Sequence, residues 1–464
     1  MNPRRNHRPR ASARFGVAFA RALFVAVAGL SGLTDPAAAE QPASATIGEG
    51  SLRLALPTIG LRTRDLAVIV NDAEPASVEI GRYYAARRGI ADDRVIHVRF
   101  TPGQRVMPFG EYLRVKEVLD ARLGPDVQAL ALAWTYPFRV ECMSVTAAFG
   151  LGFDPGSYCA EGCQTTKPHA YFNSSSHAPY TDHRVRPTML LAGTDVDSVK
   201  RLIDRGVRSD ATWPAGKAYL MSTRDPARNV RAASFGHVRA MLDSAYPIEQ
   251  IEADALEGKT DVMFHFTGVA QVAAIPSNRF LDGAIADHLT SHGGVLSGGG
   301  QTTVLEWLSA GATGSYGASS EPCNFLAKFP DIGVVMGRYL GGETLVEAYW
   351  KSVRMPGQGL FVGDPLARPF GGRRVTRTAA GTVIETRALP PGNYLLEASR
   401  STFGPFRTIG RVTAAGFGVR RLTVPAGDPR YFRLRSVPEA TKPPRERPAP
   451  AAEELASGSS GLTP

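Results

Sequence analysis

The sequence has few cysteines, no long apolar run beyond its first 39 residues and no basic stripe, and each of these scarcities excludes a class of protein. Without an apolar run long enough to cross a bilayer, we expect no transmembrane segment after residue 39. Without a basic stripe that interleaves aromatic residues, nucleic acid is not an expected partner. The remaining length, about 425 residues, suggests two or three domains with a sizeable core.

The first 39 residues have the composition of an export signal. A basic stretch with arginines at 4, 5, 8, 10 and 14 precedes the apolar stretch 15–33, and three alanines at 37–39 offer a cleavage site before Glu40. A retained membrane anchor is the alternative, but Arg21 leaves too short an uninterrupted apolar run. Loss of this segment, with its six Arg and one Asp, would lower the formal net charge from +10 to +5. We therefore expect an exported protein, periplasmic or extracellular.

Four cysteines in an exported chain predict disulfides. Cys159 and Cys163 lie in the short stretch YCAEGC, which could close on itself, and Cys142 and Cys323 could form a second bridge. A cysteine-only zinc site is the alternative, but such sites usually show CxxC pairs and this spacing is CxxxC. We therefore expect disulfides, no metal site and no other cofactor.

Strand-like and helix-like segments alternate over residues 61–370. Short buried strands are expected at 66–71, 95–100, 128–134, 188–192, 218–222 and 261–267, with helices at 76–88, 112–123, 195–205 and 232–244. This rhythm is typical of βαβ units, so it predicts an α/β domain with a mostly parallel sheet and helices on both faces. Residues 135–187, rich in Cys, Gly, Pro and Ser, interrupt the rhythm as a long excursion.

The flanking segments have different compositions. Residues 40–60 are small and polar and predict a flexible N-terminal segment. Residues 371–437 alternate apolar and polar positions between PPG, FGP, AAG and AGD turns, which predicts a small immunoglobulin-like β-sandwich. Residues 438–464 are rich in Pro, Ala, Glu and Ser and predict a disordered tail.

The stretch from Phe280 to Phe370 holds most candidate site residues. GGVLS, ATGSYGA and GLFVG read as buried strands, helix-like segments lie between them, and glycine or proline marks nearly every junction. A parallel α/β sheet carries its sites at such a loop edge.

His288, Ser291 and Cys323 are the candidate catalytic residues. His288 and Ser291 lie three residues apart at an expected helix end, where one helical face would allow proton transfer between them. Capping of that helix is the alternative. Cys323 could be a nucleophile with His288 or His265 as base, but a disulfide would remove its thiolate. His265, between two phenylalanines of a strand, is otherwise interpreted as a core residue.

Five further residues are candidate ligand-binding groups. Each follows a strand-like run or an adjacent turn: Asp72, Arg139, Gln301, Glu321 and Asp364. Gln301 follows the turn Gly298–Gly300, whose backbone N–H groups could bind an anion at a helix N-terminus. The alternative assigns these side chains to turns, ion pairs and an N-cap by Thr302. If they bind one ligand, all should lie at the carboxyl edge of one sheet.

Many blocks of residues 65–370 resemble a known family. NDAEPASVEIGRYYAARRGI, TYPFRVEC, RPTMLLAG, AIADHLTSHGG, SSEPC, EAYWKSV and FVGDPLARPF are similar to blocks of an uncharacterised family of exported bacterial proteins, found in genomes that carry exosortase (PEP-CTERM) sorting systems. The resemblance implies export and leaves the activity open.

A remoter likeness is to gingipain- and caspase-like cysteine peptidases. These have a strand that ends in His-Gly, a next strand that ends in the nucleophilic Cys, and a late Gly-Asp-Pro. Here Val269 follows FHFTG where His is expected, Ser297 or a glycine of Gly294–Gly300 takes the Cys position, and Gly363-Asp364-Pro365 matches. The likeness implies a peptidase-like α/β fold without the standard Cys/His pair.

Three hypotheses follow. The first is an exported envelope protein that binds a ligand or a protein, with envelope proteins or exported polymers as partners. The second is a hydrolase with a rearranged site, and the third is a non-catalytic scaffold that docks through its β-module.

Overall fold

The computed structural model describes residues 45–47, 52–55, 59–160, 163–298, 300–389, 391–426 and 431–437. In the first two of these ranges it describes the backbone alone. The expected export signal at 1–39 and the expected tail at 438–464 lie outside these ranges.

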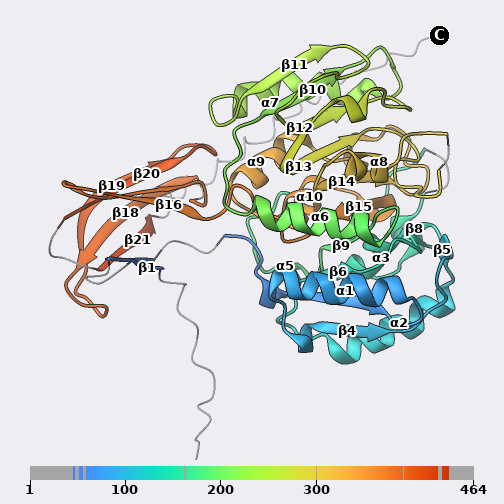
Figure 1. Cartoon of the computed structure of the whole chain (residues 1–464), viewed down its shortest axis with the longest axis horizontal. Helices are drawn as coiled ribbons and strands as arrows, with labels where there is room; N and C mark the ends of the chain where they lie inside the picture. Colours follow the sequence, from blue (N-terminus) through green and yellow to red (C-terminus); the bar gives the residue numbers. More distant parts are fainter. Residues whose placement is uncertain are drawn as a thin grey trace, which may run out of the picture. The chain divides into compact units, whose positions relative to one another are not determined.

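A ten-stranded sheet organises the α/β part of the chain (Figure 1). Its strands, in sheet order, are β11 (Ile248–Glu252), β10 (Lys217–Ser222), β12 (Val262–Thr267), β13 (Phe280–His288), β14 (Gly314–Ala318), β15 (Gly359–Gly363), β9 (Thr188–Leu190), β6 (Ala129–Leu132), β3 (Leu66–Asn71) and β4 (Val95–Val98).

The sheet is mostly parallel. The run β11-β10-β12-β13-β14 is parallel throughout, and so is the run β9-β6-β3-β4. Between them, β15 pairs antiparallel with β14 over five residue pairs, from Gly314 opposite Gly363 to Ala318 opposite Gly359. The carboxyl ends of β10, β12, β13 and β14 therefore lie at one edge, which we call the carboxyl edge.

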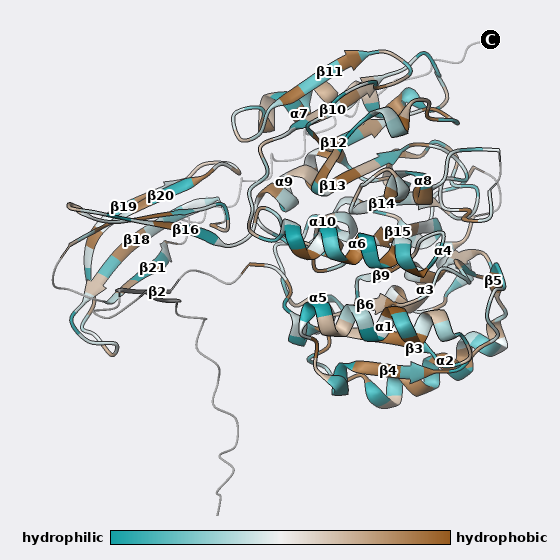
Figure 2. Ribbon diagram, in the orientation of Figure 1, coloured by the Kyte–Doolittle hydropathy of each residue, from teal (hydrophilic) through white to brown (hydrophobic). Residues whose placement is uncertain are grey.

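Successive residues of the central strands face two different apolar clusters. In β3, Val68 and Val70 lie in one cluster with residues of α1 (Pro75–Arg88), whereas Ala67 and Ile69 lie in the other with residues of α2 (Phe109–Arg122). This alternation follows from the two-residue period of a strand. Both faces of the sheet are thus covered, and Figure 2 shows apolar strands beneath helices whose outer sides are hydrophilic.

The other helices are short or moderate in length. The remaining α-helices are α3 (Val145–Leu151), α4 (Pro155–Tyr158), α5 (Pro179–His183), α6 (Val196–Ser209), α7 (Phe235–Leu242), α8 (Val304–Ser309), α9 (Ile332–Leu340) and α10 (Leu345–Ser352). The 3-10 helices are η1 (Thr63–Asp65), η2 (Asp92–Arg94), η3 (Asn229–Ser234), η4 (Ile275–Ser277), η5 (Leu326–Lys328) and η6 (Pro356–Gln358).

Local sequence explains where the main helices begin and end. α1 begins at Pro75, whose fixed φ suits a first helical position, and ends at Gly89, which has φ +65°. α6 begins with a reciprocal capping box between Asp195 and Ser198. These two helices pack against each other in front of the sheet in Figure 1.

The excursion at 135–187 folds into short elements. Strands β7 (Arg139–Val140) and β8 (Met143–Ser144) form a small sheet with β5 (Val106–Met107), followed by α3, α4 and α5. α3 packs on β15 and β9, so part of the excursion covers the centre of the large sheet.

The C-terminal segment forms two further sheets. One contains β1 (Ala45–Ile47), β2 (Leu52–Ala55), β21 (Tyr431–Val437), β18 (Gly392–Ser399) and β19 (Arg407–Ala414). The other contains β16 (Arg373–Thr378), β17 (Gly381–Thr386) and β20 (Arg420–Pro425).

Side chains of both sheets share one apolar cluster, to which Ile384, Leu396, Leu422 and Phe432 belong. The segment 40–60, expected to be flexible, supplies β1 and β2, and β2 pairs parallel with β21.

Two elements of the stretch 280–370 differ from expectation. Residues 280–288 are a strand, β13, whereas a helix was expected to end near His288 and Ser291. β13 is a strand because it lies between β12 and β14 and is buried from Gly283 to His288. Its backbone departs from extended geometry at Gly283, where φ is +91°. GGVLS, expected as a strand, forms turns instead.

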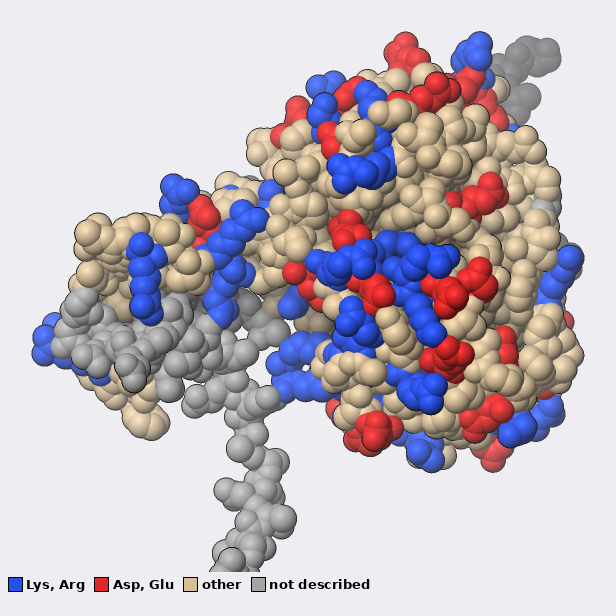
Figure 3. All heavy atoms as spheres, in the orientation of Figure 1, with Lys and Arg blue, Asp and Glu red and all other residues tan. Residues whose placement is uncertain are grey.

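Cations and anions alternate on the face of the molecule that carries α1 and α6 (Figure 3). Ion pairs there join Arg87 to Asp204, Lys200 to Glu79 and Arg208 to Asp282. None of the described helices is long and apolar enough to span a membrane.

Candidate functional site

A hollow of about 340 Å³ opens at the carboxyl edge of the sheet. The loops after β10, β13 and β14 form it, together with one residue of the excursion. We call it the edge pocket, and it is lined by Cys163, Ala227, Arg228, Leu289, Thr290, Ser291, Glu321, Cys323 and Asn324. Parallel sheets place their ligand sites at this edge.

Arg228 is the cation of the edge pocket. Its Nη1 donates to Asp225 Oδ2 at 2.9 Å and its Nε donates to Thr290 Oγ1 at 3.2 Å. Its Nη2 has no hydrogen-bond partner among the residues that the structure describes. Since the side chain is 28% exposed, this N–H group is available to a ligand in the pocket.

Gln301 orders the loop that follows β13. Its Oε1 accepts from Thr290 Oγ1 at 2.8 Å and from the backbone N of His292 at 2.7 Å. Because Thr290 donates to Gln301, its oxygen is free to accept from Arg228. Gln301 therefore lies behind the pocket and holds Thr290, which contacts Arg228, in place.

The protein has two disulfides, one of which lies at the rim of the pocket, and their pairing differs from the expected one. Cys142 bonds to Cys159 and Cys163 bonds to Cys323, with Cα–Cα distances of 5.9 and 5.4 Å. The expected Cys159–Cys163 and Cys142–Cys323 pairs are wrong. α3 and α4 return the chain so that Cys159 faces Cys142, and the loop after β14 brings Cys323 to Cys163.

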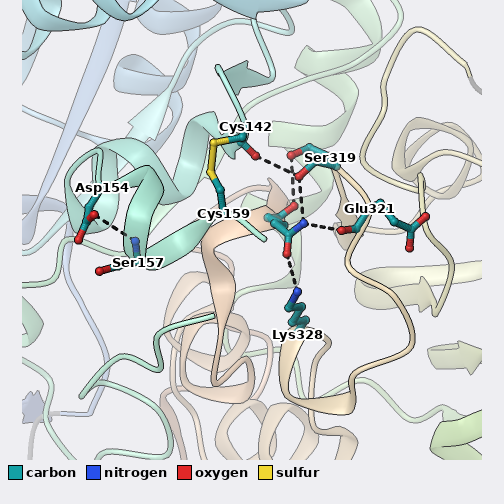
Figure 4. Close-up of a disulfide and its surroundings, with 9 residues drawn as sticks. Cys142, Asp154, Ser157, Cys159, Ser319, Glu321 and Lys328 are labelled. Carbon is teal, nitrogen blue, oxygen red and sulfur yellow. Dashed lines mark hydrogen bonds between the residues drawn. A yellow bond between two sulfur atoms is a disulfide. The ribbon is translucent and has the colours of Figure 1, made fainter. Parts of the chain in front are cut away.

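Hydrogen bonds to Cys142 and Gln358 anchor the loop after β14, as Figure 4 shows around the Cys142–Cys159 bridge. Ser320 Oγ donates to the carbonyl O of Cys142 at 3.0 Å. Gln358 donates to the carbonyl O of Glu321 and accepts from Lys328 Nζ at 2.7 Å. Burial lowers the pKa of Lys328 to about 8, and this lysine holds Gln358 rather than facing the pocket. The anchoring leaves the carboxylate of Glu321 at the rim, 48% exposed on its side chain.

His288 and Ser291 are not placed for mutual proton transfer. They lie at the end of β13 and in the loop after it, not on one helical face, because 280–288 is a strand. His288 is fully buried, and its Nδ1 accepts from Trp307 Nε1 at 3.0 Å. Burial lowers its pKa to about 3, so this imidazole stays neutral and its basic nitrogen is occupied. Ser291 does line the pocket.

In the comparison with cysteine peptidases, the nucleophile is expected at the end of the strand after β12. That strand is β13. The position expected for the nucleophile comes after His288, at Leu289-Thr290-Ser291, rather than at Gly294–Gly300. Neither stretch contains a cysteine. Cys323 cannot act as the nucleophile, because its sulfur is bonded to Cys163.

Asp364 lies away from the pocket. Gly363 pairs with Gly314 at the start of β14, so the carboxyl end of β15 lies at the edge opposite the carboxyl edge. There Asp364 is fully buried, accepts from Tyr84 Oη at 2.8 Å and pairs with Arg88. The expectation that it shares the carboxyl edge with His288, Gln301 and Glu321 is therefore wrong, because β15 is antiparallel to β14.

Asp72 and Arg139 also lie outside the pocket lining. Asp72 pairs with His97 Nδ1 at 2.6 Å beside the outermost strand β4, five strands from β14 in the sheet. Arg139 is half-buried in β7 over the ring of Phe138, and burial lowers its pKa. Of the predicted site residues, Ser291, Glu321 and Cys323 line the pocket and Gln301 supports it.

Sequence reasoning missed Arg228, Thr290 and Asn324. Arg228 follows Asp225-Pro226, a turn signal that comes shortly after the expected strand 218–222. A loop in that position leads to the same edge as the loops after the next parallel strands. The position of Arg228 in the loop after the expected strand 218–222 was thus the only signal that could have found it, since the residues around it form no motif.

The glycine turn before α8 has a structural role. Gly298 and Gly300 have φ +83° and +71°, values that favour glycine. Thr303, and not Thr302, caps α8 through a capping box with Glu306. Thr302 Oγ1 instead accepts from the backbone N of Val272 at 2.9 Å. α8 spans only six residues, so we assign no anion site to its N-terminus.

One cluster has side chains of the types that bind metals. His177, Glu343 and Glu347 offer ligand atoms within 4.8 Å of one another. Their charges are already paired within the protein, because Glu343 contacts Lys351 and Arg338, and Glu347 accepts from His177 at 2.8 Å. Burial raises the pKa of Glu347, but the hydrogen bond from His177 and the positive charge of Lys351 outweigh it and lower the pKa to about 2. This arrangement is an internal ion-pair network.

Comparisons with known proteins give little. No family model matches the chain, and no curated protein matches it. A solved structure called "Structure of Protease" is similar over 77% of this chain and 97% of its own length, with 9% sequence identity and a TM-score of 0.36. A likeness this distant does not assign this chain to a family.

Proposed function

We propose that the chain is a binding protein whose edge pocket takes a polar, peptide-like ligand that carries both charges. The ligand offers a carboxylate to Arg228 and an ammonium group to Glu321, and the hydroxyl of Ser291 supplies a further hydrogen bond. The observation that carries the proposal is the Nη2 of Arg228, which no described residue engages, while Asp225 and Thr290 hold the other two nitrogens. A guanidinium fixed in this way loses little side-chain entropy on binding a carboxylate.

Hydrolysis through a thiolate is not supported. All four cysteines are bonded in pairs, and the histidines of β12 and β13, His265 and His288, are buried. His292 Nε2 lies 4.0 Å from Glu321 Oε2 at the pocket, but the chain offers it no free thiol to activate. A thiol nucleophile needs both a free thiolate and a base within reach. We therefore propose binding, with hydrolysis by another group as an outcome of the test.

Paired peptides test the proposal. Titration calorimetry compares Ac-Asp-Gly-Lys-NH₂ with its neutral counterpart Ac-Asn-Gly-Gln-NH₂, each also made with two and three glycines. We expect the charged peptide to bind at least tenfold more tightly, about 1.4 kcal/mol. Arg228→Ala should remove the advantage of Asp over Asn, and Glu321→Gln should remove the advantage of Lys over Gln.

Each variant should weaken the contact with one end of the peptide only, so the two variants should lose different parts of the affinity. Arg122→Ala, at an exposed arginine that ends α2, is the matched control and should leave both affinities unchanged. Equal binding of charged and neutral peptides, or variants that lose both advantages together, would contradict the proposal. Cleavage of a peptide, followed by mass spectrometry, would favour the hydrolase hypothesis instead.

We also propose that the protein is exported, which the two disulfides and the composition of residues 1–39 support. The domain division is part of the same proposal: a peptidase-like α/β domain at 61–370 and an immunoglobulin-like module at 371–437. The shared apolar cluster of the two C-terminal sheets supports a sandwich. Association with exosortase systems rests on the sequence blocks and stays a prediction.

A further inference from the structure

A second hollow, of about 280 Å³, lies between η5, the start of α9 and the end of α10. We call it the η5–α9 hollow, and it is lined by Phe172, Arg231, Ser234, Leu326, Ala327, Phe329, Pro330, Asp331, Ile332, Ser352 and Arg354. Most of its wall is apolar. Leu326 is 51% exposed there, although it is a large aliphatic side chain. A concave apolar wall with a few polar groups is typical of a small-molecule site.

Arg354 supplies an unpaired cation at this hollow. Its guanidinium lies 5.0 Å from the ring centroid of Phe172, and it forms no ion pair with any described residue. It is exposed. The other charges of the lining are already engaged, because Asp331 Oδ1 accepts from the backbone N of Val334 and Arg231 pairs with Asp287 at 2.6 Å.

Arg231 adds a second, buried donor. Its side chain is only 5% exposed, its Nη1 and Nη2 donate to Asp287 and to the carbonyl O of Thr267, and its Nε has no partner in the described chain. A buried N–H without an acceptor is costly. An acceptor brought in by a ligand would relieve that cost.

We propose that the η5–α9 hollow binds a small apolar carboxylate. The apolar group fills the space between Phe172, Leu326 and Ile332, and the carboxylate pairs with Arg354 and reaches toward Arg231. An aliphatic carboxylic acid and the apolar last residue of a peptide share this chemistry. A free acid is required, because an amide carries no charge to pair with Arg354.

The test is a calorimetric titration of the full chain with matched probes. N-acetyl-L-phenylalanine should bind at least tenfold more tightly than N-acetyl-L-phenylalaninamide. Arg354→Ala should weaken binding of the acid at least tenfold and leave binding of the amide unchanged. Asp331→Asn keeps an N-cap on α9 but removes a nearby negative charge, so it should strengthen binding of the acid severalfold.

Two further arms complete the experiment. Arg122→Ala is the control and should bind the probes like the unchanged protein. A comparison of octanoate with Ac-Ala-Ala-Phe shows whether the hollow prefers an aliphatic acid or the end of a peptide. Tighter binding of either one supports the proposal. Equal affinity for acid and amide, an unchanged affinity in Arg354→Ala, or no saturable binding of any probe would overturn it, provided that circular dichroism shows a folded variant.

Discussion

Three histidines are buried in the α/β domain as neutral residues: His169, His265 and His288. Burial lowers their pKa values to about 4, 3 and 3, below the ordinary value near 6.5. His265 is the extreme case. Neither of its ring nitrogens has a hydrogen-bond partner among the described residues, and its ring lies edge-on to Trp307 at 4.9 Å. Between pH 6.5 and about 4, the unfolded chain therefore binds protons at these residues and the folded chain does not.

We therefore predict acid sensitivity that His265→Phe reduces. Between pH 6.5 and 3 the unfolded state binds a proton at residue 265 and the folded state does not, so stability is present above pH 6.5 and falls as the pH is lowered. The loss is about 1.4 kcal/mol per pH unit for each such histidine. Urea unfolding at pH 7.5, 6.5, 5.5 and 4.5 should show a shallower decline in His265→Phe. Parallel declines in both proteins would show that His265 is not buried neutral.

Single residues of the candidate site could be predicted only in part. Glu321 lines the edge pocket because it follows β14, whose residues were expected as a strand, whereas Ser291 lines the pocket after β13, where a helix was expected. Asp364 also follows a strand, but its edge depends on whether β15 is parallel or antiparallel to its neighbour. A β-branched or aromatic run fits either direction, so local sequence could not place Asp364.

At the scale of elements, β14 lies unusually close to the loop after β13. A Cβ added at Gly317 would lie 2.4 Å from the backbone C of Gly293 and from the backbone N of Gly294. The contact is backbone to backbone, so no side chain can move aside. This close approach brings the loop with Thr290 and Ser291 against the loop with Glu321, and it thereby shapes the edge pocket.

Gly317→Ala should therefore destabilise the protein by about 1–3 kcal/mol, the usual cost of overpacking a core. Gly236→Ala is the matched control, because Gly236 lies in α7 and its added Cβ would meet nothing within 4 Å. There the change should be neutral or stabilise by up to about 1 kcal/mol. Urea unfolding measures both. A Gly317→Ala variant as stable as the control would contradict the close contact.

Element type was predictable where a segment had one clear period. Residues 66–71 were expected as a strand and form one with those bounds. The helix expected at 76–88 begins at Pro75 and ends at Arg88. The failure at 280–288 has a physical cause, since FLDGAIADH is buried on both faces and lacks the alternation that marks a half-exposed strand. Only its neighbours β12 and β14 decide its conformation.

At the scale of the whole molecule, the two disulfides constrain loops of very different length. Cys142 and Cys159 are 17 residues apart, whereas Cys163 and Cys323 are 160 residues apart. Closing the longer loop removes more conformational entropy from the unfolded chain, by about 2 kcal/mol if the entropy follows the logarithm of loop length.

The pair Cys163→Ser, Cys323→Ser should thus destabilise the protein by about 2 kcal/mol more than the pair Cys142→Ser, Cys159→Ser. Urea unfolding without reductant measures the difference, and each double variant serves as the control for the other. Peptide mapping of the unreduced protein checks the pairing independently. Equal losses, or a peptide that links Cys159 to Cys163, would contradict this account.

The order of the cysteines along the chain also bears on how the protein is made. Each cysteine is joined to the next one in sequence, first Cys142 to Cys159 and then Cys163 to Cys323. A polypeptide that emerges from its N-terminus can close the first bridge before the second pair is complete. Cys163 then waits as a single thiol until Cys323 arrives. Biogenesis in this order needs an oxidant but no reshuffling of earlier bridges, so a dithiol oxidase would suffice without a disulfide isomerase.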